Sequence, residues 1–153
     1  MACKRVPVSV VCLLSAAHYH GQINEEPSAV WLAIDSKSWC PSTSRIAIKT
    51  VWFSGDAMPQ GVVNQRIEGI PIRVFSPMKT IADLLKYRNK IGIDVALQSL
   101  RASLAIKQYS PYRLLHFARI CRVERLATEI IHEFGSGRDF KGRQIRSLWK
   151  ERL

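Results

Sequence analysis

The spacing of apolar residues changes once along this chain of 153 residues, and that change limits the folds open to it. Before residue 76, apolar side chains alternate with polar ones or form short runs rich in β-branched residues, as strands do. After residue 76 they recur every three to four residues, as in helices with one buried face. Because strands come first and helices follow, the pattern predicts an α+β domain rather than alternating βαβ units.

Four segments of the first half are predicted to be strands, because they combine apolar alternation with β-branched and aromatic residues. Their ranges are 29–34, 45–53, 62–67 and 70–75. Between the last two lies Glu68-Gly69, which predicts a β-hairpin, since glycine adopts positive φ without strain. Trp31 and Trp52 fall within apolar strands, so both are expected in the core rather than on a surface that stacks bases.

Helix start signals are clear at two places in the sequence. Ser76-Pro77 and Ser110-Pro111 each pair an N-cap residue with proline in the first helical position, and predict helices over 77–88 and 111–120. Further helices are expected over 95–104 and 123–134, and a buried helix over 7–20 opens the chain. The predicted fold is a small mixed or antiparallel sheet with an amino-terminal helix and a carboxy-terminal set of helices.

The charge of the chain is strongly positive and unevenly distributed. Lysine and arginine total 23 against 12 acidic residues, which gives a net charge of +11. Residues 1–75 carry 7 basic and 5 acidic side chains, whereas residues 76–153 carry 16 and 7. A surface of this kind attracts polyanions such as nucleic acid or anionic lipid. A basic surface that only aids solubility is the alternative.

The end of the chain is the most basic part of that half. Residues 1–134 are assigned to one domain and residues 135–153 to a basic carboxy-terminal extension. The residues of the extension expected to contact nucleic acid are Arg138, Lys141, Arg143, Arg146 and Lys150.

The cysteines favour a reducing compartment. The four are scattered without a CxxC pair or a histidine at zinc-finger spacing, so no metal site is predicted, and free thiols in the cytoplasm fit best. Lys4-Arg5 followed by the apolar run 6–17 resembles a signal peptide, which is the alternative interpretation. No apolar run reaches the roughly 20 residues of a membrane span, so no membrane partner is expected.

Residues for catalysis are few. No glycine-rich phosphate loop is present, Cys12 has no evident histidine partner, and the strands supply few carboxylates to hold a catalytic metal. His18 and His20 are two apart near a helix end, where their side chains point in different directions. We therefore expect neither an enzyme nor a bound cofactor.

The stretch Ser76-Pro-Met-Lys-Thr-Ile-Ala-Asp83, followed by residues 86–97, resembles the central signature of AbiEi-family antitoxin carboxy-terminal domains. Its surroundings follow the family in the same order. The other segments that carry the resemblance are 11–17, 30–34, 51–55, 67–77 and 118–123. The resemblance covers about residues 4–134.

The resemblance implies a regulatory role. Members of the family are antitoxins of type IV toxin–antitoxin systems, which oppose a nucleotidyltransferase-like toxin without a stable complex and act as DNA-binding transcriptional regulators through an amino-terminal winged helix. This chain begins just before the first helix of the later domain, so it is expected to lack that DNA-reading module. The alternative function is that of a stand-alone, non-specific nucleic-acid-binding protein.

The signature segment has two interpretations. Lys79 and Asp83 are four apart, so they share a helix face and favour a structural ion pair, and Thr80 is placed to bond the Ser76 carbonyl. The functional alternative is a polar surface that contacts a partner or nucleic acid. Its residues would be Lys79, Thr80, Asp83, Lys86, Arg88 and Lys90.

Overall fold

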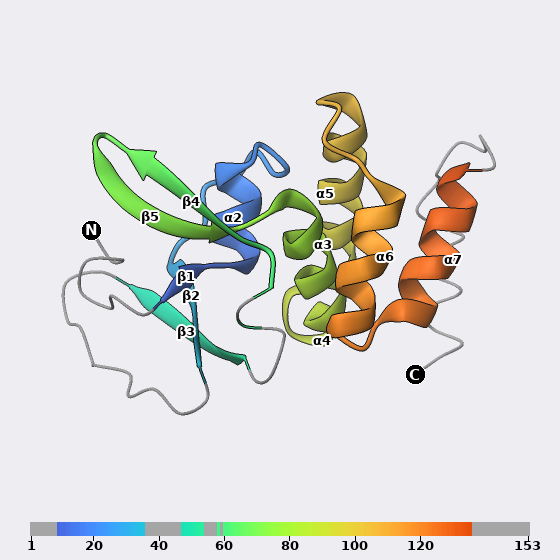
Figure 1. Cartoon of the computed structure of the whole chain (residues 1–153), viewed down its shortest axis with the longest axis horizontal. Coiled ribbons are helices and arrows are strands. Elements are labelled where there is room, and N and C mark those ends of the chain that lie inside the picture. Colours follow the sequence, from blue (N-terminus) through green and yellow to red (C-terminus); the bar gives the residue numbers. More distant parts are fainter. Residues whose placement is uncertain (1–8, 36–46, 54–57, 59, 136–153) are drawn as a thin grey trace.

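The structure is a computed structural model that describes residues 9–35, 47–53, 58 and 60–135. A five-stranded sheet forms one end of the molecule, and helices stack beside it toward the other end (Figure 1). The predicted α+β class is confirmed. None of the helices within the described ranges is both long and apolar enough to cross a membrane.

The sheet is mixed, with the strand order β3-β2-β1-β5-β4. Its strands are β1 (Val10–Val11), β2 (Val30–Asp35), β3 (Ile48–Phe53), β4 (Val62–Ile67) and β5 (Ile70–Phe75). The central strand β1 runs antiparallel to β2 and parallel to β5, while β3 is parallel to β2. The predicted hairpin of β4 and β5 is confirmed with the expected bounds, and Glu68 and Gly69 both have positive φ in its turn.

The amino-terminal helix is shorter than predicted. Val10 and Val11 form the central strand instead of helix, because these β-branched residues pair with strands on both sides. Helix α2 (Leu13–Tyr19) follows. Just after it, Gly21 has a φ of +75°, which lets the amide of Gln22 reach the carbonyl of Ala17 at 2.8 Å. The expectation of a helix over 7–20 is therefore wrong for the two valines.

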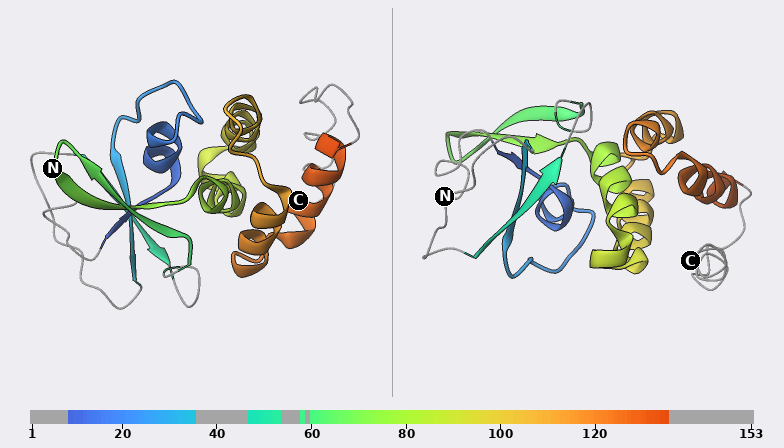
Figure 2. Two further views of the ribbon diagram at one scale, coloured as in Figure 1. Left: turned by 45° about the horizontal axis from the view of Figure 1, so that its top comes forward. Right: turned by 90° about the horizontal axis from the view of Figure 1, so that it is seen from below.

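The carboxy-terminal helices follow the predictions closely. They are α3 (Pro77–Lys86), α4 (Arg88–Ile91), α5 (Ile93–Ala105), α6 (Pro111–Ile120) and α7 (Glu124–Gly135). The predicted helix over 77–88 stops at Lys86, because a new turn, α4, begins at Arg88. Figure 2 shows α3 next to the sheet and α7 farthest from it.

Helix α3 is the centre of the fold. It packs against α2, α5 and α6, and all eight of its residues from Met78 to Leu85 are buried. A helix covered on every side is usually apolar all round. This one carries Lys79, Thr80 and Asp83, so their polar groups must be satisfied inside the protein.

The two tryptophans predicted to lie in the core differ in their exposure to solvent. Trp31 is 5% exposed, as expected, but Trp52 is 53% exposed. The two lie in adjacent parallel strands, where Trp31 is paired with Lys49 and Trp52 with Ile34. Successive side chains of a strand point to opposite faces of the sheet, and Trp52 alternates with the buried Val51 and Phe53. The prediction for Trp52 was wrong.

Candidate functional site

A buried ion pair lies at the junction of sheet and helices. Helix α3 begins directly after β5, and the i, i+4 spacing brings Lys79 Nζ to 2.9 and 2.8 Å from the two carboxylate oxygens of Asp83. Their side chains are 0% and 1% exposed. The cost of removing both charges from water is thus offset by a close, two-oxygen contact.

Aromatic rings complete the surroundings of the Lys79 ammonium group. Its Nζ lies 3.9 Å from the ring centroid of Phe75 and 4.8 Å from that of Phe53. Phe53 stacks between Phe75, at 5.5 Å, and Tyr87, at 5.8 Å. Since the faces of aromatic rings attract cations, β3 and β5 stabilise the charge that α3 buries.

Gly61 allows the chain to pass close to the Lys79 stem. A Cβ at this position would lie 2.8 Å from both Cβ and Cγ of Lys79, and 3.1 Å from a ring carbon of Phe117. The Gly61 φ of +82° also favours glycine, and its carbonyl accepts a 2.8 Å hydrogen bond from the Ser76 amide. Any side chain here would displace the lysine.

Two buried cysteines lie close to the pair. Cys121 donates its thiol proton to Asp83 Oδ1 at 3.2 Å, and burial raises the pKa of Cys121 to about 12. Burial also raises the pKa of Cys12 well above its ordinary value, and the nearby Asp83 charge adds to the effect. Both thiols are therefore protonated at neutral pH and serve as small apolar and donor groups rather than nucleophiles.

Burial and Lys79 have opposite effects on the pKa of Asp83. Burial raises the pKa of its carboxyl, while the charge and hydrogen bonds of Lys79 lower it, and burial prevails. Burial likewise raises the pKa of Tyr87 to about 12, with Asp83 contributing. Apart from Lys79 and Asp83, the titratable groups around the pair are therefore kept in their neutral, protonated forms.

These contacts correct the functional interpretation of the signature segment. Lys79, Thr80 and Asp83 are fully buried and cannot form a surface for a partner. Thr80 donates to the Ser76 carbonyl at 2.9 Å, as its spacing predicted. The other members of the expected polar surface are separate from them: Lys86 and Lys90 are exposed, and Arg88 is half-buried with a 2.8 Å bond to the Leu85 carbonyl.

The two Ser-Pro starts also differ. Ser110 accepts a hydrogen bond from the amide of Arg113, as an N-cap does. Ser76 makes no such bond, and its buried hydroxyl has no partner among the described residues. The expectation of a side-chain cap is therefore correct for α6 and wrong for α3.

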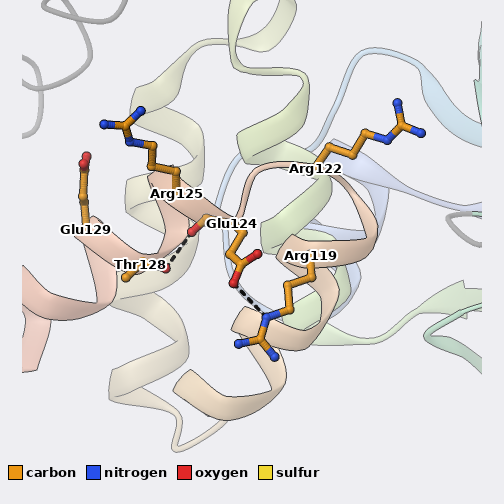
Figure 3. Close-up of a pocket in the computed structure, with 6 residues that line it drawn as sticks. All are labelled: Arg119, Arg122, Glu124, Arg125, Thr128 and Glu129. Atoms are coloured by element: carbon orange, nitrogen blue, oxygen red, sulfur yellow. Dashed lines mark hydrogen bonds and ion pairs between the residues drawn. The ribbon is translucent and has the colours of Figure 1, made fainter.

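An arginine-lined hollow lies at the opposite end, where α6 meets α7. It has a volume of about 520 Å³ and is lined by Arg119, Arg122, Glu124, Arg125, Thr128 and Glu129. Arg119 is paired with Glu124 at 2.9 Å, whereas the guanidinium groups of Arg122 and Arg125 extend in different directions (Figure 3). Such divergent cations suit an extended polyanion better than one small anion.

Arg122 occupies a backbone position that usually belongs to glycine. It follows α6 with φ of +62°, and the next amide, of Val123, donates to the Ala118 carbonyl at 2.8 Å. A non-glycine residue costs about 1 kcal/mol or more there. The turn places the Arg122 side chain at the rim of the hollow.

Sequence reasoning missed these arginines, although a signal was present. Arg119, Arg122 and Arg125 lie close together in the sequence, at the junction between the helices predicted over 111–120 and 123–134. The predicted binding residues Arg138, Lys141, Arg143, Arg146 and Lys150 lie outside the described residues. Within the described part, no group of three or more histidine, cysteine or acidic residues is placed to hold a metal ion.

No family model matches this sequence, and no curated protein matches it significantly. A proposal of function therefore rests on the chemistry of the chain's own residues and on the resemblance of its sequence segments.

Proposed function

We propose that this domain is a regulatory module of the AbiEi antitoxin type, which opposes a nucleotidyltransferase-like toxin and contacts nucleic acid through its carboxy-terminal half. It acts by binding rather than by catalysis. The two ends of the molecule have different roles. The sheet and α3 stabilise the fold, and α6 and α7 carry exposed arginines that contact nucleic acid.

One observation carries the antitoxin part of the proposal. Three of the segments that resemble the family, although spread over more than 100 residues, supply residues close to Lys79 or Asp83. Segment 11–17 supplies Cys12, segment 51–55 supplies Phe53, and segment 118–123 supplies Cys121. These contacts make the three segments parts of one packed region, which supports treating them as one signature.

The antitoxin role is tested in cells. The domain is expressed together with a nucleotidyltransferase-like toxin encoded beside it, and growth is followed. We expect at least partial recovery of growth, and an equal recovery with the surface variant Tyr19→Ser, which changes an exposed side chain. Full toxicity in the presence of soluble, folded domain contradicts the proposal.

A stand-alone, non-specific nucleic-acid-binding protein is the second candidate, and the arginine-lined hollow at α6 and α7 favours it. Contacts from divergent arginines to phosphates carry no sequence information, so scrambled and operator-like duplexes should bind equally. Fluorescence anisotropy with both duplexes measures this. A preference above about tenfold, or ~1.4 kcal/mol, contradicts the non-specific role and favours a transcriptional regulator.

A further inference from the structure

A second groove, of about 870 Å³, separates the hairpin from the start of α6. Its walls come from the start of β4, the first turn of α3, the loop after α5 and the first half of α6. A volume of this size is within the range of ligand-binding pockets, about 300–1,000 Å³. The arginine-lined hollow at α6 and α7 shares no lining residue with it.

The lining combines cations with aromatic rings. Lys107 and Arg113 supply positive charge, and none of the described residues that line the groove is acidic. Tyr112 stands on its edge with 84% of its surface exposed, which is unusual for so large a side chain. Beside it, the rings of His116 and Phe117 meet edge to face with centroids 5.2 Å apart.

Lys107 repeats the backbone feature of Arg122. It follows α5 with φ of +58°, and the next amide, of Gln108, donates to the Ser103 carbonyl at 2.8 Å. Glycine is the usual residue at such a helix end. A lysine there places a cation at the groove at the cost of backbone strain.

Two polar atoms of the groove residues also lack partners. The hydroxyl of Ser76 and the side-chain carbonyl of Gln108 are buried without a hydrogen bond to any described residue. An unsatisfied buried acceptor is unfavourable, and a donor brought by a ligand would relieve it after rotation of the side chain. The amino groups on nucleobases are donors of this kind.

We infer that this groove binds single-stranded nucleic acid, with unpaired bases stacking on Tyr112 and His116 and phosphates contacting Lys107 and Arg113. The inference rests on the nucleic-acid-binding part of the proposed function and names its ligand class. Bases within a duplex are already stacked on each other, so an exposed ring flanked by cations favours a single strand. Stacking is tolerant of sequence, because every base has a π face.

The test compares one labelled single-stranded oligonucleotide of mixed sequence with its duplex, using fluorescence anisotropy on the full chain. Tyr112→Ala should weaken single-strand binding by about 5- to 150-fold, whereas the matched control Tyr112→Phe, which keeps the ring, should stay within about threefold of the parent. Duplex binding should change by less than about threefold in both. Lys107→Gly, which fits the positive φ, should weaken single-strand binding without loss of folded protein.

Equal single-strand binding by the parent and Tyr112→Ala overturns the inference, and an acidic peptide then becomes the better occupant of the groove. If duplex binding persists in that case, the proposed nucleic-acid contact of the domain still stands. If the full chain binds neither form at low salt, both the inference and the nucleic-acid part of the proposed function fail.

Discussion

Two ion pairs of nearly equal length show how differently this chain uses charge. Lys79 and Asp83 approach to 2.8 Å with side chains 0% and 1% exposed, while Arg119 and Glu124 approach to 2.9 Å with 59% and 50% exposed. Water screens the exposed pair, which contributes at most about 1 kcal/mol. Removing either member of the buried pair leaves an unpaired charge inside the protein, which is strongly destabilising. The first pair is thus part of the fold, and the second leaves arginine free to exchange partners.

Removing one buried charge should have the largest effect. Lys79→Met leaves the Asp83 carboxylate without its cation, so we expect a decrease of about 3–5 kcal/mol in the free energy of unfolding. The double variant Lys79→Met with Asp83→Leu should recover most of that decrease, because neither charge remains. Denaturant unfolding measures all three proteins, and a double variant less stable than the single one contradicts a stranded charge as the cause.

The same variant should change the pH dependence of stability. The pKa of Asp83 is raised above 3.8 in the folded state, so the native protein retains a proton that the unfolded chain releases. Stability from this group is present below pH 3.8 and is lost as pH rises through the raised pKa. Without Lys79 that pKa rises further, and the destabilisation by Lys79→Met should therefore grow as the pH rises through the raised pKa of the parent. Denaturant unfolding across a pH series measures this, and a destabilisation that stays constant with pH contradicts it.

A methyl group placed against the lysine stem should have the next largest effect. Gly61→Ala combines strain at φ +82° with a 2.8 Å approach to Lys79, and should cost about 2–4 kcal/mol. Gly69→Ala is the matched control, since its φ is +80° but nothing lies within 4 Å, and should cost only about 1 kcal/mol. Equal midpoints in denaturant for the two variants would contradict the prediction, because they would show that the Lys79 side chain can move aside at no cost in stability.

The two Ser-Pro helix starts give the smallest effects. Ser110→Ala removes a cap bond and should cost about 1 kcal/mol. Ser76→Ala removes a hydroxyl that has no partner among the described residues and should change the free energy of unfolding by less than about 0.5 kcal/mol. Thermal unfolding of the pair measures the difference. A larger decrease for Ser76→Ala contradicts the assignment of its carbonyl, rather than its hydroxyl, as the group that stabilises the helix start.

Sequence reasoning succeeded where local chemistry determines the structure. The hairpin of β4 and β5 follows from its Glu68-Gly69 turn, and the start of α6 follows from Ser110-Pro111. The predictions failed where residues far apart in the sequence determine the secondary structure. Val10 and Val11 became strand only because β2 and β5, far along the chain, pair with them.

The candidate site likewise depends on both local spacing and distant residues. The spacing of Lys79 and Asp83 predicts an ion pair, but on an isolated helix such a pair is exposed. Its burial depends on Phe53 from β3 and Cys121 after α6, and no pattern around residue 79 records either. The concentration of arginines at positions 119, 122 and 125 is, by contrast, visible in the sequence, whereas their directions depend on the turn at Arg122.

The central claim is that the buried charges hold the fold while the exposed arginines bind nucleic acid. The direct test is the salt dependence of duplex binding for the parent and for the triple variant Arg119→Gln, Arg122→Gly and Arg125→Gln, followed by fluorescence anisotropy. We predict that the slope of log K against log salt becomes shallower by up to about 0.9 for each phosphate that the variant no longer neutralises, with an unfolding free energy within about 1 kcal/mol of the parent. The same slope and affinity in both folded proteins would contradict the claim.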